Sequence, residues 1–566
     1  MSGWKIDYPR RVILSEAKDP SGRNGSAGFF ASLRMTVSGG FSFCVLLCVF
    51  VATHAGCSKP AAAPGQVLRL SQRNEPATLD PQLATLPDEF FIIRALSEGL
   101  LTPAPGGGAP LPGAAEKWEV SADGLTYTFH LRAGAKWSNG DAVTAGDFVY
   151  SIHRALSPAF AAPKAALFFP LKNAEAFYTG REREFAAVGV RALDDRRLEL
   201  TLGEPVADFP AMVASGSWIP VHPDTMEKSR GMDQRNPAWT RPGNFIGNGP
   251  YILTGWRPNQ DITVRRNPAY WDAAHVLQSE IRFLAFDNGD SEERAFRAGQ
   301  VDVTMAVPVT KLAGYRAASP PVLHDAPLHE TRYLALNTTR PPLDDVRVRR
   351  ALALALDRTA LVEKVLQGGQ QPAFNFVPPG LGGYAPREKI TADAAEARRL
   401  LAAAGFPGGR GFPKLELTTW PVNPAQLEAI QQRWARELGI EVTLAPREAR
   451  THLAALAAGD YALAFMTAIP DYDGASDLFN RLKTGSPDNY PHWSSAEFDR
   501  LVAAAGRLDS AAARNTAYQL AEHVLLDEMP VIPLYFNAQN FLVQPAVKGW
   551  QADRLWTRFY KNLSVK

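Results

Sequence analysis

The chain has 566 residues, of which 60 are Lys or Arg and 58 are Asp or Glu, so its formal net charge is only +2. This balance, with no long basic run, argues against a nucleic-acid-binding surface. All 3 cysteines lie within the first 57 residues, so the rest of the chain has no internal disulfide and no cysteine-ligated metal site. With 46% hydrophobic residues, the body that follows is long enough for two to four domains.

The cysteines fall in a leader-like segment. An apolar run at 43–52 has the length of a signal-peptide core and is too short to span a membrane. It ends in small residues that are followed by Cys57. This pattern resembles a bacterial lipoprotein signal, in which Cys57 would be lipidated, become the mature N-terminus and anchor the protein to the membrane. We therefore expect a leader at 1–57 and a Pro/Ala-rich tether at 58–66.

Two features of the leader depart from the lipoprotein pattern. His54 stands where an aliphatic residue is usual, and no Lys or Arg lies between Met35 and Cys57, although such leaders normally begin with positive charge. Met35 is therefore a candidate true start of translation. The alternative to lipidation is ordinary cleavage near Ala55, which would give a soluble periplasmic protein.

Strand and helix patterns alternate along the first half of the body. The segment 125–132 alternates strictly, which predicts a half-buried strand with Tyr127 and Phe129 in the core. Thr144, with Asp147 three residues later, is a capping-box pattern that predicts the start of a helix. In chain order we predict a strand at 67–70, a helix from 88 that stops at Gly99, a strand at 125–132, a helix after Thr144, a strand at 198–202 and a strand that ends at Pro268.

The second half continues in the same way. The segment 344–369 is the strongest helical pattern of the chain, with charges at its start and glycines at its stop. We expect the charges of its first turns, Arg349 among them, on a solvated face. The other elements are a helix from 291 that turns at Gly299 into a strand, a strand at 332–339, a helix at 394–406, a helix–Gly439–strand unit at 426–445, a helical pair at 498–528 and a strand at 530–536. Such alternation predicts an α/β fold.

The chain carries none of the short motifs that mark common enzymes. G-x-S-x-G, H-E-x-x-H and a Walker A loop are absent, since His329-Glu330 is followed by Thr, Arg and Tyr. The 10 histidines are scattered, so we expect each on the surface or hydrogen-bonded in the core. The acidic run of Asp471, Asp473 and Asp477 looks like a calcium loop, but its glycine comes too early and no Glu stands at the twelfth position, so an exposed turn is the plainer interpretation. We predict no cofactor, no metal site and no enzymatic activity.

Several long stretches resemble the peptide/nickel-type (family 5) extracytoplasmic solute-binding proteins of ABC importers, above all the oligopeptide-binding proteins. The likeness covers nearly everything from Val67 to the C-terminus and agrees with the export signal. It is carried by AAEKWEVSADGLTYTFHLRAGAKWSNGDAVTAGDFVYSIHRALSP at 114–158, IGNGPYILTGWRPNQDITVRRNPAYWD at 246–272, AFRAGQVDV at 295–303, LALNTTRPPLDDVRVRRALALALDR at 334–358 and PHWSSAEFDRLV at 491–502.

The resemblance implies a two-lobed periplasmic-binding-protein fold with an extra domain, whose lobes close around a ligand about a hinge. By analogy, domain I comprises 67–87, 245–332 and 537–566, domain II comprises 88–244, and domain III comprises 333–536. It further implies a non-catalytic, monomeric receptor on the periplasmic side of the cell envelope, which delivers peptides to an ABC permease and ATPase complex in the inner membrane.

The resemblance also implies roles for single residues. An Asp of the peptide binders pairs with the ligand's N-terminal ammonium, and Asp471 in PDY stands at the matching position; a fixed carboxylate offsets the water that an enclosed ammonium loses. Glu75 in RNEP lies on the segment that lines the groove from domain I, where a binding role and a structural role both stay open. Some oligopeptide binders have a Trp where Ala468 stands and, where Phe465 stands, an Arg that meets the ligand's carboxylate. We therefore hypothesise a receptor for peptides of several lengths, or for a ligand with an amine but no short-range carboxylate.

Two other classes of function stay open on the sequence. The same scaffold holds non-peptide cargo in other members, such as a nickel chelate, heme, an oligosaccharide or an opine, because a fold does not fix a function. We see no clustering of His or Met of the kind that nickel or heme binding would lead us to expect. The third possibility is an exported hydrolase, against which the absence of the common enzyme motifs argues.

Overall fold

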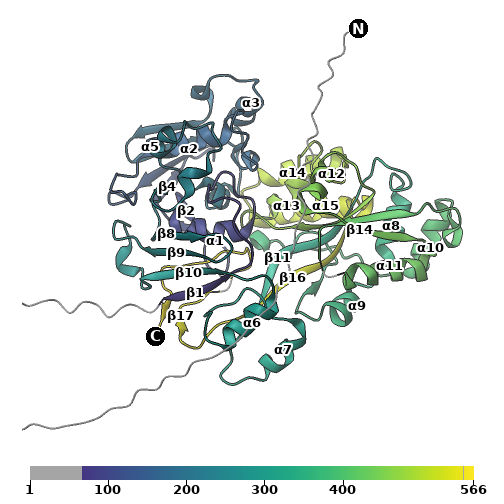
Figure 1. Ribbon diagram of the computed structural model, residues 1–566. Helices are drawn as coiled ribbons and strands as arrows, with labels where there is room; N and C mark the ends of the chain where they lie inside the picture. Colours follow the sequence, from purple (N-terminus) through teal and green to yellow (C-terminus); the bar gives the residue numbers. More distant parts are fainter. Residues whose placement is uncertain (1–66, 423, 552) are drawn as a thin grey trace, which may run out of the picture. The chain divides into compact units, whose positions relative to one another are not determined.

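The computed structural model describes residues 67–422, 424–551 and 553–566 (Figure 1). The expected leader and tether, including Cys57, lie outside these residues. Within them, three sheets of four or more strands carry the fold, and a hydrophobic core belongs to each. No helix in this described part is long and apolar enough to cross a membrane.

The first sheet combines the opening strand of the body with three later ones. Leu68 and Leu70 of the opening strand are fully buried with Ile281 and Phe283 of its neighbour, and α1 (Pro87–Leu96) contributes to the same core. The opening strand is parallel to that neighbour, and the other pairs are antiparallel. The order is β1 (Leu68–Gln72), β10 (Glu280–Ala285), β9 (Asp261–Arg266) and β8 (Tyr251–Arg257).

The second sheet is antiparallel and is packed against α2 (Ala145–Leu156). The start of α2 confirms the predicted capping box: the Asp147 N–H donates to Thr144 Oγ1 at 3.3 Å, and the Thr144 N–H donates to Asp147 Oδ2 at 3.0 Å. Tyr127 and Phe129 face the core, as the alternation predicts. The strand order is β4 (Ala115–Val120), β5 (Thr126–Leu131), β7 (Arg197–Thr201) and β6 (Val190–Asp194).

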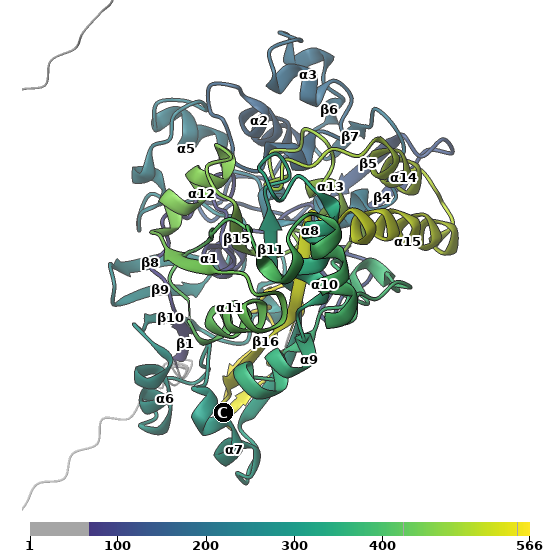
Figure 2. The same ribbon diagram turned by 90° about the vertical axis from the view of Figure 1, so that its right-hand side faces the viewer.

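The third sheet holds the two longest strands, which run antiparallel side by side (Figures 1 and 2). Their ladder shifts register between Pro327 and Thr331, so residues 328–330 stay outside the pairing. On one side of this bulge Leu323 and Leu542 belong to a small separate core, and on the other side Leu334 enters the core of the third sheet. The strand order is β12 (Gln371–Pro372), β16 (Val531–Leu542), β11 (Leu323–Leu336), β15 (Leu463–Ala468), β13 (Leu415–Thr419) and β14 (Val442–Pro446).

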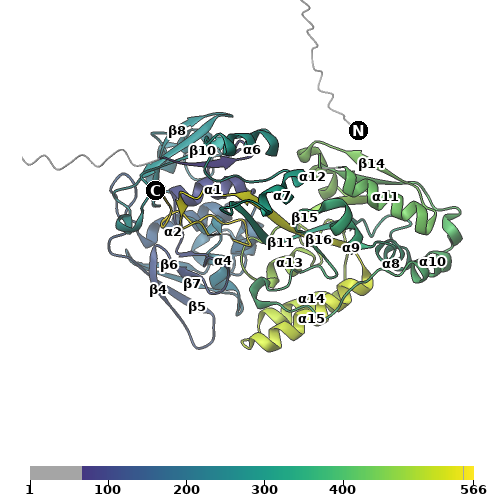
Figure 3. The ribbon, with the colours of Figure 1, turned by 90° about the horizontal axis from the view of Figure 1, so that it is seen from below.

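Helices flank the third sheet. α14 (Ala496–Gly506) and α15 (Ala511–Glu528) form the predicted helical pair (Figure 3). α11 (Ala425–Leu438) ends at Gly439 in the left-handed conformation and leads into β14, also as predicted. The other helices of this region are α8 (Val346–Leu354), α9 (Arg358–Ala360), a π-helical turn at Leu361–Leu366, α10 (Ala394–Ala403), α12 (Ala449–Ala457) and α13 (Ala475–Arg481).

The single long helix predicted at 344–369 is wrong, because the chain breaks between α8 and α9. The cause is Arg358, which is only 2% exposed. Its guanidinium donates to the carbonyls of Ala353 at 3.2 Å and Leu356 at 3.3 Å, and to the carbonyl of Pro533 on β16 at 2.7 Å. A side chain therefore binds carbonyls at the end of α8, and the Ala353 carbonyl accepts the Leu356 N–H at 3.4 Å in addition.

Two smaller expectations are also wrong. Arg349 is buried, and it donates to the Glu528 carbonyl at 2.6 and 2.8 Å instead of facing solvent. The strand predicted after Gly299 is reduced to isolated bridges of Val303. The remaining short elements are β2 (Leu101–Thr102), β3 (Leu111–Pro112), α3 (Ala174–Tyr178), α4 (Phe209–Val213), α5 (Pro223–Lys228), α6 (Gly289–Arg297), α7 (Val309–Arg316), β17 (Val547–Lys548), β18 (Ser564–Val565) and 3-10 turns at Ala165–Phe168, Phe185–Ala187, Gly216–Trp218, Pro237–Thr240, Ala273–His275, Leu381–Gly383 and Pro407–Gly409.

Candidate functional site

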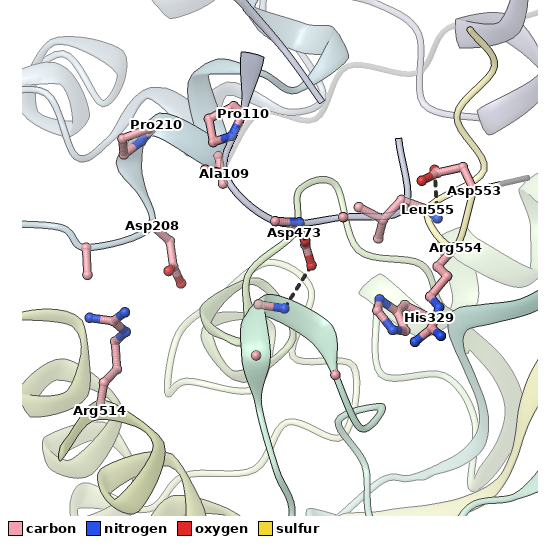
Figure 4. A pocket seen from close by; sticks show the side chains of 18 of the residues that line it. Ala109, Pro110, Asp208, Pro210, His329, Asp473, Arg514, Asp553, Arg554 and Leu555 are labelled. Atoms are coloured by element: carbon pink, nitrogen blue, oxygen red, sulfur yellow. Dashed lines mark hydrogen bonds between the residues drawn. The ribbon is translucent and has the colours of Figure 1, made fainter. Parts of the chain in front are cut away.

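A cavity of about 710 Å³ is lined by segments that lie far apart in the sequence (Figure 4). One side, which we call the 106–211 wall, consists of the loop 106–110 between β2 and β3 and the start of α4. Opposite it, the 380–514 wall consists of a glycine-rich turn, Asp473 and Arg514 of α15. Trp118 of β4, His329 from the β11 bulge and the C-terminal residues 553–555 complete the lining.

Asp473 joins the two walls. Its Oδ2 accepts the N–H of Gly108 at 2.7 Å, and its Oδ1 accepts the N–H of Gly382 at 2.8 Å. Gly107 has a φ of +93°, and a Cβ at this position would lie 2.9 Å from Asp473 Oδ2. The loop therefore needs glycine to bring its amide to the carboxylate.

Asp471 lies in a smaller cavity of about 30 Å³ that shares Gly107, Gly108 and Asp473 with the large one. Its carboxylate is bound by two cations from different parts of the chain. Lys164 Nζ, from the connection between α2 and α3, donates to Oδ1, and Arg481 Nη2 of α13 lies 3.1 Å from Oδ2. The side chains of Lys164 and Asp471 are each 21% exposed, so this ion pair is largely removed from water.

The negative charge of Asp471 is balanced by two cations of the chain itself. Burial alone would raise the pKa of Asp471, but Lys164 and Arg481 outweigh it and hold that pKa below its ordinary value. Arg481 Nη2 also lies 2.8 Å from Asp477 Oδ2 and donates to the Ile469 carbonyl at 2.8 Å. Burial, only partly offset by Arg481, raises the pKa of Asp477 to about 7. Arg481 is thus held by other partners besides Asp471, whereas Asp471 is the one ion-pair partner of Lys164 among the described residues.

The acidic run is therefore not the exposed turn that the sequence suggests. Asp471 and Asp477 share Arg481, whereas Asp473 binds two backbone amides. Among the described residues, no group of three or more His, Cys, Asp or Glu side chains is placed to hold a metal ion.

Glu75 is exposed and holds a turn. Its Oε1 accepts the indole N–H of Trp256 at 2.7 Å, and its Oε2 accepts the N–H of Asn259 at 2.9 Å, both in the β8–β9 hairpin. Glu75 does not line the 710 Å³ cavity. It does not line the smaller cavity of Asp471 either, so the structure does not bring the two residues together in one cavity. The contacts of Glu75 favour the structural one of its two expected roles.

His329 contradicts the expectation that each isolated histidine is exposed or hydrogen-bonded. It is 7% exposed, it lines the 710 Å³ cavity, and neither ring nitrogen has a partner among the described residues. Burial lowers its pKa to about 4; the charge of Asp473 opposes this shift and the charge of Arg554 adds to it. The imidazole is therefore neutral at pH 7.

Sequence reasoning missed Lys164, His329 and Arg554 as site residues. Lys164 is 307 positions away from Asp471, and His329 reaches the cavity only because the β11 ladder bulges. A lone Lys, His or Arg carries no local signal that would have marked these positions.

Comparison with known proteins shows which family has this sequence and architecture. Residues 109–490 match the family model for bacterial extracellular solute-binding proteins, family 5 Middle. The probable deoxycholate-binding periplasmic protein YgiS of Escherichia coli is 35% identical, over 89% of this chain and 94% of its own length. The periplasmic oligopeptide-binding protein OppA of Salmonella typhimurium is 32% identical, over 89% of this chain and 93% of its own length.

Solved structures agree with the sequence relatives. The murein tripeptide binding protein MppA of Escherichia coli matches with a TM-score of 0.80 at 30% identity, over 89% of this chain and 99% of that chain. OppA of Haemophilus influenzae, solved in complex with RPPGFSPFR, matches with a TM-score of 0.79 at 30% identity over the same shares. The chain belongs to the bacterial extracellular solute-binding proteins of family 5 and has their two-lobed α/β fold.

Proposed function

We propose that the protein is a periplasmic receptor that encloses an oligopeptide between its lobes and delivers it to an ABC importer of the inner membrane. Relatives named as oligopeptide-binding and murein peptide-binding proteins, 32% and 31% identical over 89% and 90% of this chain, support this cargo. The cavity supports it as well, because its volume of about 710 Å³ lies within the range of about 300–1,000 Å³ that is usual for ligand sites.

The observation that carries the proposal is the ion pair between Lys164 and Asp471. A primary ammonium already lies on this carboxylate, so the site fits the size and charge of a peptide's N-terminal ammonium. We propose that the peptide ammonium takes the place of Lys164 when the cleft fills. Arg481 keeps its contact with Asp471 and holds the carboxylate in position during the exchange.

Calorimetric titration of the mature chain tests this role. Asp471→Asn should weaken binding of free Ala-Ala-Ala by about 2 kcal/mol, or about 30-fold, because an enclosed ammonium then lacks its counter-charge. Binding of N-acetyl-Ala-Ala-Ala should change little. Asp194→Asn removes an exposed carboxylate on β6 and serves as the matched control. Equal weakening of both peptides in Asp471→Asn would show that Asp471 has only a structural role.

A second candidate cargo is a carboxylate-bearing amphiphile such as deoxycholate. It is favoured because Lys164 already neutralises Asp471, so a cargo without an ammonium leaves that pair intact. The 35% identical relative named for deoxycholate binding points the same way. Binding of deoxycholate that Asp471→Asn does not change, together with no binding of free-amine peptides, would favour this candidate over the first.

We also propose that Cys57 is lipidated and holds the receptor, as a monomer, at the membrane. The support is the sequence pattern of the leader, with Met35 as a candidate start. Mass spectrometry of the membrane fraction should find a lipid-modified N-terminal peptide that begins at Cys57, and Cys57→Ser should move the protein to the soluble periplasmic fraction. Unchanged membrane association of the variant, or a mature chain that starts near Ala55, would contradict lipidation.

We also propose a division into three domains. Domain I comprises 67–87, 245–332 and 537–566, domain II comprises 88–244, and domain III comprises 333–536. Its boundaries within the third sheet lie opposite one another, because Thr331 pairs with Phe536 and Arg332 with Tyr535. These pairs adjoin the β11 bulge, where the strand pair passes between two cores, so we place the hinge there. Ligand should slow amide hydrogen exchange in residues 328–332, and unchanged exchange would argue against this hinge.

A further inference from the structure

The bulge of β11 aims a histidine with unused hydrogen-bonding groups into the cleft. The backbone N–H of His329 donates to the Arg554 carbonyl at 2.8 Å, which ties the bulge to the C-terminal segment. Its imidazole is more than nine-tenths buried and has no partner for either nitrogen in the described part of the chain. A buried polar group without a partner costs the fold free energy, because its lost hydrogen bonds to water are not replaced. A ligand that supplies the missing partner would recover this free energy.

Arg554 presents its guanidinium at the same place. The residue is exposed, and no described carboxylate or carbonyl accepts a hydrogen bond from its side chain. A Cβ built on Gly380 would lie 3.5 Å from Arg554 Nη1 and 3.7 Å from His329 Nε2, so both nitrogens border the open space beside Gly380. Figure 4 shows the two side chains next to each other at the edge of the cavity.

The other charged groups of the cavity are already engaged. Asp473 and Asp553 each accept two backbone N–H groups. Arg514 donates to the Leu508 carbonyl at 2.7 Å, and Asp208 accepts the Ser476 hydroxyl at 2.5 Å. Among the titratable side chains that line the cavity, Arg554 and His329 are therefore the two without a described hydrogen-bond partner, and the chemical group that complements a guanidinium and a neutral imidazole together is a carboxylate.

We propose that Arg554 and His329 form a subsite for a carboxylate of the cargo. Arg554 supplies the charge and a fork of N–H donors, and His329 supplies a further donor from its neutral ring. The inference deepens the proposed function, on which it rests, by naming where the negative charge of the ligand binds. It also replaces one of the two hypotheses drawn from the sequence, that of a ligand with an amine but no short-range carboxylate. Phe465 is fully buried in the core of the third sheet, and Arg554 would supply the cation for a carboxylate instead.

The test is calorimetry on the full mature chain with probes that differ only in one carboxylate. Ala-Ala-Ala is compared with its C-terminal amide, and the amides of Ala-Glu-Ala and Ala-Gln-Ala are compared with each other. The first pair reports on a terminal carboxylate and the second on an acidic side chain, and deoxycholate adds a non-peptide acid. Arg500→Gln serves as the charge-matched control, because Arg500 pairs with Glu497 on its own exposed helix face.

The subsite binds either the terminal carboxylate or an acidic side chain, so one of the two peptide pairs should respond. In that pair, Arg554→Gln should weaken binding of the acidic peptide about tenfold and leave binding of its neutral analogue unchanged. His329→Leu should weaken the same acid about fivefold, with a melting temperature no lower than that of the wild type. Equal loss for acid and neutral forms, or no loss in either variant, overturns the subsite while the peptide receptor stands. If the wild type binds none of these probes, the subsite and the proposed function both fail.

Discussion

Lys164 is the internal competitor of the proposed ligand ammonium, so removing its charge should tighten binding of free-amine peptides. In Lys164→Met the ligand no longer has to break an ion pair before it reaches Asp471. Both side chains are about one-fifth exposed, which places the pair between a surface ion pair and a fully buried one. We therefore expect a gain of about 1–2 kcal/mol, or about 5- to 30-fold in Kd. Arg481 lies 3.1 Å from Asp471 and should keep this contact in the variant, so that the carboxylate retains one partner.

Titration of Lys164→Met with free and N-acetylated Ala-Ala-Ala at pH 7 measures this gain. The free peptide should bind more tightly and the acetylated peptide should not, because it brings no ammonium to Asp471. Lys164→Arg keeps the positive charge and should stay near the wild type, while Lys117→Met removes an exposed charge on β4 as a control. If Lys164→Met weakened both peptides equally, Lys164 would be a ligand contact and the competition argument would be wrong.

Two further predictions concern the loop that Asp473 holds and the buried acid Glu522. Gly107→Ala and Gly108→Ala both place alanine at positive φ, but only Gly107→Ala also crowds Asp473. In denaturant unfolding, Gly107→Ala should therefore lose about 1 kcal/mol more of the free energy of unfolding than Gly108→Ala. Equal losses in the two variants would contradict this geometry. Burial raises the pKa of Glu522 from 4.5 to about 7, although its carboxylate accepts two backbone N–H groups and a tyrosine hydroxyl. The folded state then keeps a proton that the unfolded chain loses, so this contribution to stability is present below pH 4.5 and is lost as the pH rises through 7. The melting temperature of the wild type should fall relative to that of Glu522→Gln between about pH 5 and about pH 8. If the melting temperatures of both proteins changed with pH in the same way, the raised pKa would be contradicted.

Local signals were enough to predict much of the fold. The capping box of Thr144 and Asp147 involves residues three apart, so its pattern is complete in the sequence, and the structure confirms it. The alternation at 125–132 likewise reports directly on which side chains enter the core. The family resemblance then supplied the two-lobed arrangement, which no local pattern contains.

Long-range contacts explain what the sequence could not predict. The helix at 344–369 breaks because Arg358 reaches the carbonyl of Pro533, 175 positions later, and helical periodicity is blind to that partner. The cation on Asp471 comes from Lys164, and the orientation of His329 depends on the register between β11 and β16. Each of these is a meeting of distant segments, and the residue types involved are common on ordinary surfaces.

The proposed recognition of peptides depends most on the exchange of one ammonium for another at Asp471. A crystal structure of the protein with a bound free-amine peptide tests this exchange directly. The terminal nitrogen of the peptide should lie about 3 Å from the Asp471 carboxylate, with Lys164 Nζ moved off it. If the amine of the bound peptide lay elsewhere, with Lys164 still paired to Asp471, the exchange would not take place.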